Sequence, residues 1–253
     1  MSISGCECYN PMSVDDRFLE KDSLANFTPP VVGNTADFSF LVIADTHYGW
    51  TPYEFFSHIE SIRVAQGIEF VVILGDITEA GRQAQFDSAK SDIAKTSIPV
   101  YPVIGNHDIF ASGWDFYKYA FGRSVYNFTV GTNNFIFLDT ASGTMGSYQR
   151  TWLESTLASS PSGKKLIFTH FSPTDDDIQS FTEFSYPEER YFLFNLLDTY
   201  NVDLYLCGHL HINDDKTIRD VRYMIIKNIS EGIASGTLMK VRINAGVITV
   251  TYL

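Results

Sequence analysis

The sequence predicts an α/β fold in which two stacked, mixed β-sheets are flanked by helices within a single domain, an α/β/β/α sandwich. Short apolar runs alternate with amphipathic segments in the first half of the chain, a pattern typical of a parallel sheet covered by helices. The last segments look antiparallel instead, which makes the sheets mixed. The 253 residues include 20 Phe, 14 Tyr and 3 Trp, and so many aromatic side chains favour thick packed sheets over a helical bundle.

The first half is a β-α-β-α-β alternation. Apolar runs rich in β-branched residues predict strands over Phe38–Ala44, Glu69–Leu74 and Ile98–Ile104. Between them, apolar residues recur at helical spacing over Pro52–Gly67, and Arg82–Lys95 is a polar amphipathic segment. Three strands joined by two helices predict a parallel sheet, whose strands all end at one edge.

The second half contains a hairpin, two helices and further strands. Tyr126–Val130 and Phe135–Asp139 flank the turn signal Gly131–Asn134. Helical patterns cover Gln149–Ser159 and Pro187–Tyr200, the latter with Pro where the first turn tolerates it. The remaining predicted strands are Lys165–Thr169, Val202–Cys207, Lys216–Arg219, Tyr223–Lys227, Leu238–Ile243 and Val247–Tyr252, with the last hairpin turn at Asn244–Gly246.

The domain organisation follows from where this pattern begins. Residues 1–36 lack periodicity and contain Pro29-Pro30 and Gly33-Asn34, so they are interpreted as a tail or wrapping segment, and residues 37–253 as the domain. The net charge of −12 disfavours nucleic acid as a partner. No apolar run approaches the ~18 residues of a membrane span.

The cysteines do not suggest a disulfide framework, because Cys6 and Cys8 are close together and Cys207 lies in an apolar run. As it stands, the sequence indicates a cytoplasmic protein. The alternative comes from Ile3-Ser4-Gly5-Cys6, which resembles the end of a bacterial lipoprotein signal. In that case the natural protein would be exported and anchored to lipid through Cys6.

Five of the six histidines follow predicted strands, where ligands gather in α/β folds. In Asp45-Thr46-His47, residues i and i+2 project to one side, so a carboxylate and an imidazole can reach one metal ion. After the next strand, Gly75 permits a sharp exit and Asp76 could bridge two cations. His209 and His211 repeat the i, i+2 spacing after a later strand, and His170 ends another.

The stretch Gly105-Asn106-His107-Asp108 ends the third strand. Because neighbouring side chains diverge, Asn106 is expected on a metal ion and His107 on the substrate. Asp108 is expected to hold the tautomer of His107, as carboxylates do for functional imidazoles.

Other polar residues receive structural interpretations. His58 lies in the middle of a predicted helix and is expected at the surface. Asp139 is expected to satisfy backbone groups. Cys207 is interpreted as a small core residue, and Asp175-Asp176-Asp177 as a solvated loop.

The ordered set Asp-x-His, Gly-Asp, Gly-Asn-His-Asp, His and Gly-His-x-His resembles the calcineurin-like metallophosphoesterase superfamily over about residues 38–252. The stretch Val100–Asp108 looks most like the bacterial cyclic-nucleotide phosphodiesterase branch. Gly75-Asp76 is followed by Ile77-Thr78-Glu79, without the Tyr of purple acid phosphatases, which disfavours that branch.

The resemblance implies a dinuclear metal centre. It places Asp45, His47, Asp76 and His211 on the first metal, and Asp76, Asn106, His170 and His209 on the second. It also implies His107 as the catalytic residue, supported by Asp108. Imidazole, carboxylate and amide ligands suit divalent or trivalent Mn, Fe or Zn better than Ca or Mg.

The implied reaction is hydrolysis of a phosphoester by attack of a metal-bound hydroxide. Two divalent cations, less two carboxylates and one hydroxide, leave a formal charge of about +1, which attracts a small phosphoester anion. The predicted substrates are small phosphodiesters such as cyclic nucleotides or glycerophosphodiesters. The alternatives are a phosphomonoesterase or protein phosphatase on the same centre and, more remotely, a non-catalytic scaffold. Residues expected to line the substrate site are Tyr48, Trp50, Phe171 and Asn213.

Overall fold

A computed structural model describes residues 12–49, 54–174, 184–234 and 236–253. Its strands form two mixed sheets, which confirms the predicted fold class. The five-stranded sheet has the order β11 (Val247–Tyr252), β10 (Met239–Asn244), β1 (Asp37–Ile43), β2 (Ile68–Leu74), β3 (Val100–Val103). The six-stranded sheet has the order β4 (Tyr126–Val130), β5 (Asn133–Phe137), β6 (Lys165–Phe168), β7 (Leu204–Cys207), β9 (Val221–Ile225), β8 (Asp214–Ile218).

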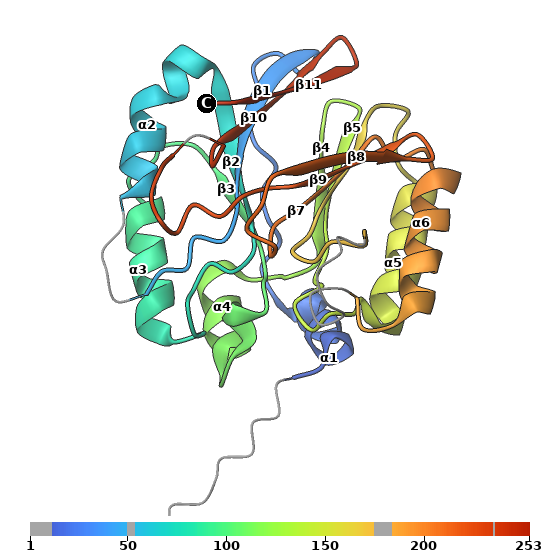
Figure 1. Ribbon diagram of the computed structural model, residues 1–253, viewed down its shortest axis with the longest axis horizontal. Coiled ribbons are helices and arrows are strands. Elements are labelled where there is room, and N and C mark those ends of the chain that lie inside the picture. The colour runs from blue at the N-terminus through green and yellow to red at the C-terminus, as the bar shows by residue number, and fades with distance from the viewer. Residues whose placement is uncertain (1–11, 50–53, 175–183, 235) are drawn as a thin grey trace, which may run out of the picture.

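Helices cover the outer face of each sheet (Figure 1). The five-stranded sheet packs against α2 (Phe55–Gln66), α3 (Gln83–Ile93) and α4 (Gly113–Phe121). The six-stranded sheet packs against α5 (Gly146–Ala158) and α6 (Pro187–Thr199). The bounds of the predicted elements differ from these by at most three residues, and two strands, β4 and β11, have the predicted bounds.

Aromatic side chains fill the space between the two sheets. The rings of Phe40 and Phe70 stack with centroids 4.8 Å apart, and Phe135 packs edge-on against both. Phe168, which belongs to the six-stranded sheet like Phe135, stacks on Phe135 with centroids 5.9 Å apart and lies edge-on to Phe40 of the other sheet. These strands are buried on both faces, which explains why they are continuous apolar runs in the sequence.

Two helices lie where the sequence pattern predicts none. The helix α1 (Val14–Leu19) begins at Ser13, whose side chain accepts a hydrogen bond from the Asp16 N–H, and it packs on α5. A 3₁₀ turn, η1 (Glu20–Ser23), follows it. The helix α4 is rich in aromatic residues, which have a greater preference for strands, and its helical form comes from packing on α3.

The sheet topology brings distant loops to one edge. Strands β1, β2 and β3 run parallel, as do β5, β6, β7 and β9. The loops that leave β1, β2, β3, β6 and β7 therefore all begin at the carboxyl ends of parallel strands. A short 3₁₀ helix, η2 (His107–Ile109), follows β3 at this edge. No helix among the described residues is long and apolar enough to cross a lipid bilayer.

Candidate metal centre

Seven predicted ligands come together where five strands end. They are Asp45 and His47 after β1, Asp76 after β2, Asn106 after β3, His170 after β6, and His209 and His211 after β7. Five of them, Asp45, His47, Asp76, His209 and His211, have φ between 44° and 68°. This left-handed region is unfavourable for residues other than Gly, and such strain is typical of functional sites.

The first cluster consists of Asp45, His47 and His211, whose ligand atoms lie within 4.8 Å of one another. The Nε2 atoms of His47 and His211 are 3.3 Å apart. His211 Nε2 lies 3.5 Å from Asp45 Oδ1. Two imidazole nitrogens and a carboxylate that converge in this way form a ligand set suited to a transition metal.

The second cluster consists of Asp76, His170 and His209, again within 4.8 Å of one another. His170 Nε2 lies 3.2 Å from Asp76 Oδ2 and 3.0 Å from Asn106 Oδ1. Its other ring nitrogen, Nδ1, donates to the Leu74 carbonyl at 2.8 Å, an arrangement that fixes the orientation of metal-binding imidazoles.

Asp76 connects the two clusters. Its carboxylate also groups with His47 and His107 within 4.8 Å, and His47 Nε2 is 3.9 Å from Asp76 Oδ2. The same carboxylate therefore faces a ligand of the first cluster and two ligands of the second. A single carboxylate in this position is what a shared, bridging ligand requires.

The pKa values of the two histidines in the second cluster are shifted in opposite directions. Nε2 of His209 is buried and has no hydrogen-bond partner among the described residues. Burial lowers the pKa of His209 to about 3, so its ring is neutral and can act as a ligand. For His170, burial opposes protonation, but the charge and hydrogen bond of Asp76 outweigh it and raise the pKa to about 9. A metal ion at this ring would therefore have to displace a proton.

Two glycines allow these loops to approach closely. Gly75 has φ 85°, and a Cβ on it would lie 2.5 Å from Nδ1 of His170. A Cβ on Gly105 would overlap the backbone nitrogen of Asp76. Any larger residue at either position would push β2 and its neighbours apart and separate the ligands.

His107 stands beside the clusters and is half-buried. Its backbone N–H donates to Asp76 Oδ1 at 2.8 Å. Its ring forms a T-shaped contact with the His47 ring, with centroids 4.8 Å apart. Nδ1 of His107 donates to the Glu79 carbonyl at 2.7 Å, which leaves Nε2 for another partner.

The prediction that Asp108 orients the His107 ring is wrong. Asp108 is fully buried, and its carboxylate accepts from the N–H groups of Ile77, Thr78 and Gly105 and from the Thr78 hydroxyl. Burial and the charge of Asp76 raise its pKa to about 6, while the three N–H donors oppose the shift. Asp108 therefore ties the loop after β2 to the loop after β3.

Asp108→Ala is expected to lower the free energy of unfolding by about 3–5 kcal/mol, because it leaves buried donors without an acceptor. Urea denaturation of the metal-free protein measures this change. Asp115→Ala, at an exposed carboxylate on α4, is the matched control and should change it by less than about 0.5 kcal/mol. Equal effects of the two substitutions would contradict the assigned role of Asp108.

Three of the predicted substrate-lining residues, Tyr48, Phe171 and Asn213, make contacts within the protein. Tyr48 is buried, and its hydroxyl donates to Asp92 Oδ2 at 2.6 Å, so it belongs to the core. Phe171 is buried and stacks on the His209 ring with centroids 4.0 Å apart. The Asn213 carboxamide bridges the Lys227 N–H and the Gly236 carbonyl. Trp50 lies outside the described residues.

The polar residues with predicted structural roles lie in the following places. His58 is exposed on α2 and Cys207 is buried, as predicted. Asp139 accepts from the Ala141 N–H, as predicted, and it also forms an ion pair with Arg17 that the sequence analysis missed. Cys6 and Asp175-Asp176-Asp177 lie outside the described residues.

Glu79 is a site residue that the sequence analysis missed. Its Oε2 lies 3.2 Å from Nδ1 of His47, and its side chain is 53% exposed. The sequence contains a signal for this role, because Glu79 follows Asp76 by only three residues, in the same loop after β2. The carboxylate adds negative charge at the rim of the centre.

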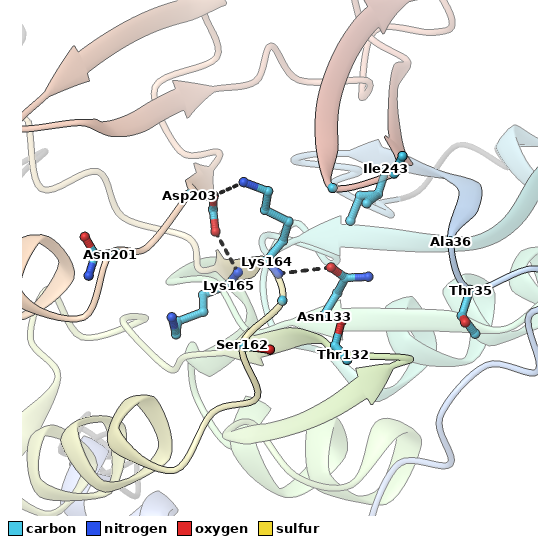
Figure 2. A pocket seen from close by; sticks show the side chains of 13 residues that line it. Thr35, Ala36, Thr132, Asn133, Ser162, Lys164, Lys165, Asn201, Asp203 and Ile243 are labelled. Atoms are coloured by element: carbon cyan, nitrogen blue, oxygen red, sulfur yellow. Dashed lines mark hydrogen bonds and ion pairs between the residues drawn. The ribbon is translucent and has the colours of Figure 1, made fainter.

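A separate cavity of about 490 Å³ lies at the opposite edge of the sandwich (Figure 2). Its walls include Asn133, Lys165 and Asp203, at or just before the amino ends of β5, β6 and β7. The Lys164 ammonium extends over it to Asp203 Oδ1 at 2.6 Å. None of the metal-site residues lines this cavity.

Comparison with known proteins points in the same direction as the geometry. A model of calcineurin-like phosphoesterases matches residues 38–213. The chain is 28% identical over 110 residues to a probable cyclic nucleotide phosphodiesterase of Fibrobacter succinogenes, covering 42% of this chain and 43% of that protein. It is 26% identical over 170 residues to a probable glycerophosphodiester phosphodiesterase of Arcobacter nitrofigilis, covering 63% and 62%. The chain thus spans less than two thirds of either relative.

Among solved structures, a dimetal phosphatase from Danio rerio has the same fold. The two superpose with a TM-score of 0.71 at 15% sequence identity, covering 88% of this chain and 96% of that chain. At this identity the similarity concerns the arrangement of sheets and helices alone.

Proposed function

Because the chain belongs to the calcineurin-like phosphoesterase family, we propose that it hydrolyses small phosphodiesters at a centre of two transition-metal ions. The observation that carries the proposal is the position of Asp76 between two clusters of imidazole and carboxylate ligands. Nε2 of His209, a buried atom of the second cluster with no hydrogen-bond partner among the described residues, supports the proposal. Mn, Fe and Zn all suit such ligands.

The proposed ligand sets share Asp76. Asp45, His47, Asp76 and His211 would hold one ion, and Asp76, Asn106, His170 and His209 the other. When bound, the ions supply an activated water and positive charge for the phosphoryl oxygens.

His107 is the proposed catalytic residue. Its Nδ1–H is committed to the Glu79 carbonyl, so the ring presents Nε2. When the ring carries a second proton, Nε2–H can donate a hydrogen bond to a phosphoryl oxygen and pass the proton to the leaving alkoxide. The hydrogen bond to Glu79 holds the ring in place while it does so.

Charge favours a diester over a monoester. With two divalent ions, two carboxylates and one hydroxide, the centre carries a formal charge of about +1. A diester monoanion neutralises this charge, whereas a monoester dianion would leave a negative excess beside Glu79. The contacts of the seven ligands within the described residues include no Lys or Arg that would offset it. The relatives named as phosphodiesterases are consistent with this preference.

For protein reconstituted with Mn²⁺, we expect kcat/KM for bis-p-nitrophenyl phosphate to exceed that for p-nitrophenyl phosphate by about tenfold or more. A tenfold ratio corresponds to a difference of only about 1.4 kcal/mol in transition-state stabilisation. Release of p-nitrophenolate measures both rates, and metal-free protein is the control. Faster hydrolysis of the monoester would replace the proposal with a phosphomonoesterase on the same centre. Hydrolysis of neither ester would contradict both.

A further inference from the structure

We infer that Arg17, which lies far from the metal ligands in the sequence, positions His170 through Asp139 and Thr140 and so tunes the affinity of the second metal site. The inference rests on the proposed function in one respect, namely that His170 and His209 bind metal. The helix α1 is thereby part of the machinery that shapes the centre.

Arg17 is an unusually buried cation. Its side chain is fully buried, although it belongs to a helix of six residues. Nε and Nη2 donate to the two oxygens of Asp139, each at 2.8 Å. Nη1 also donates to the Met12 carbonyl, and Nη2 to the Ser142 hydroxyl. A buried, bidentate pair of this kind has strict geometric requirements and is weak evidence for stability alone.

Asp139 is held from several sides at the end of β5. Besides the Arg17 pair, Oδ1 accepts from the Ala141 N–H. Its backbone N–H and carbonyl both bond to the Gln149 carboxamide of α5, each at 2.7 Å. The position of the next residue, Thr140, is therefore determined by α1 and α5 together.

Thr140 connects Asp139 to the proposed metal ligands through hydrogen bonds to the backbone of His170 and Phe171. Its Oγ1 accepts from the Phe171 N–H at 2.9 Å and from the His170 N–H at 3.3 Å, which leaves its own proton for Thr169 Oγ1 at 2.8 Å. His170 is in the second cluster, and Phe171 stacks on the ring of His209, the other imidazole of that cluster. One hydroxyl thus supports both imidazoles.

The first cluster lacks this connection. Within the described part of the chain, no contact joins Asp45, His47 or His211 to Thr140. The direct links between the clusters are the His209 N–H, which donates to the Asp45 carboxylate at 3.1 Å, and His170 Nδ1, which lies 4.0 Å from Asp45 Oδ1. A disturbance at Thr140 should therefore weaken one metal site selectively, whereas a general loss of stability would weaken both.

The test measures metal affinity in proteins that retain one site each. His47→Ala disables the first site and His209→Ala the second, and isothermal titration with Zn²⁺ gives the affinity of the remaining site. Thr140→Val removes the hydroxyl at similar volume. In the His47→Ala background it is expected to weaken Zn²⁺ binding about 10–100-fold, the loss typical of a group that supports a ligand. In the His209→Ala background it is expected to change affinity less than about twofold, and Thr140→Ser should restore binding.

A second set of variants tests Arg17 itself. Arg17→Lys keeps the charge but loses the bidentate geometry, and it is expected to weaken the second site in the same direction. The matched control is Arg242→Lys, which breaks an equally bidentate pair with Asp37, at 2.8 and 2.7 Å, on the exposed surface. That control should leave both affinities unchanged.

Three results would overturn the inference: equal weakening of both sites by Thr140→Val, no weakening by Thr140→Val or by Arg17→Lys in folded protein, or no Zn²⁺ binding in the His47→Ala background. Circular dichroism of each metal-free variant establishes folding. The proposed function fails separately, when wild-type protein binds two metal ions but hydrolyses neither test ester. In that case the selective loss at the second site would still support the positioning role.

Discussion

Asp76→Asn is expected to abolish binding of a pair of metal ions and to lower kcat by more than the ~100-fold seen for residues that only support a ligand. A neutral amide offers one weak acceptor oxygen where two cations need a shared anionic ligand. The carboxylate of Asp76 also faces His47, His107 and His170, so no other group can take over this position. Metal content by mass spectrometry and turnover of bis-p-nitrophenyl phosphate measure the two effects.

The control for this substitution separates binding from folding. Metal-free Asp76→Asn protein should remain folded by circular dichroism but unfold at a lower temperature than the wild type, because the substitution breaks the buried pair between Asp76 and the protonated His170 ring. Asp115→Asn, on exposed α4, should change neither metal content nor turnover. Two tightly bound ions and full activity in Asp76→Asn would rule out the bridging role.

His107→Ala is expected to retain both metal ions and to lose about 10²–10⁴-fold in kcat, the usual contribution of a general acid or base. The substitution removes the ring but leaves the backbone N–H that donates to Asp76 Oδ1. The geometry of the shared carboxylate is therefore preserved. Stopped-flow measurement of a single turnover at saturating substrate separates this loss from changes in binding.

His58→Ala is the matched control, because this histidine is exposed on α2. It should leave kcat unchanged. Unchanged turnover in His107→Ala would remove the catalytic assignment. Loss of one metal ion in that variant would instead make His107 a ligand, in keeping with its place in a group with His47 and Asp76.

The fold class and the location of the site could be predicted from the sequence, because both depend on local patterns. An apolar run followed by a polar loop identifies the carboxyl end of a strand, and parallel strands bring those ends together. Spacing of two residues likewise places Asp45 with His47, which share a cluster with His211. The family match confirms the resemblance that the order of these motifs indicates.

Other features could not be predicted, since they depend on partners far along the chain. Tyr48 follows two ligands directly, yet its side chain turns into the core to reach Asp92, 44 residues away. Asp108 is next to His107 in the sequence, but its carboxylate accepts hydrogen bonds from the loop after β2. The His107 ring donates to the Glu79 carbonyl instead.

Residue type and strand period are local properties, so the sequence alone predicts which side chains could bind metal and at which strand ends they lie. The direction of each side chain, and the groups that hold it in place, depend on contacts between distant parts of the folded chain. The direction of a side chain after a strand depends on the backbone dihedral angles and on its rotamer, and at Asp76 φ is 46°, in the left-handed region. Contacts such as that of Arg17 with Asp139, across 122 residues, exist only after the chain has closed around its core.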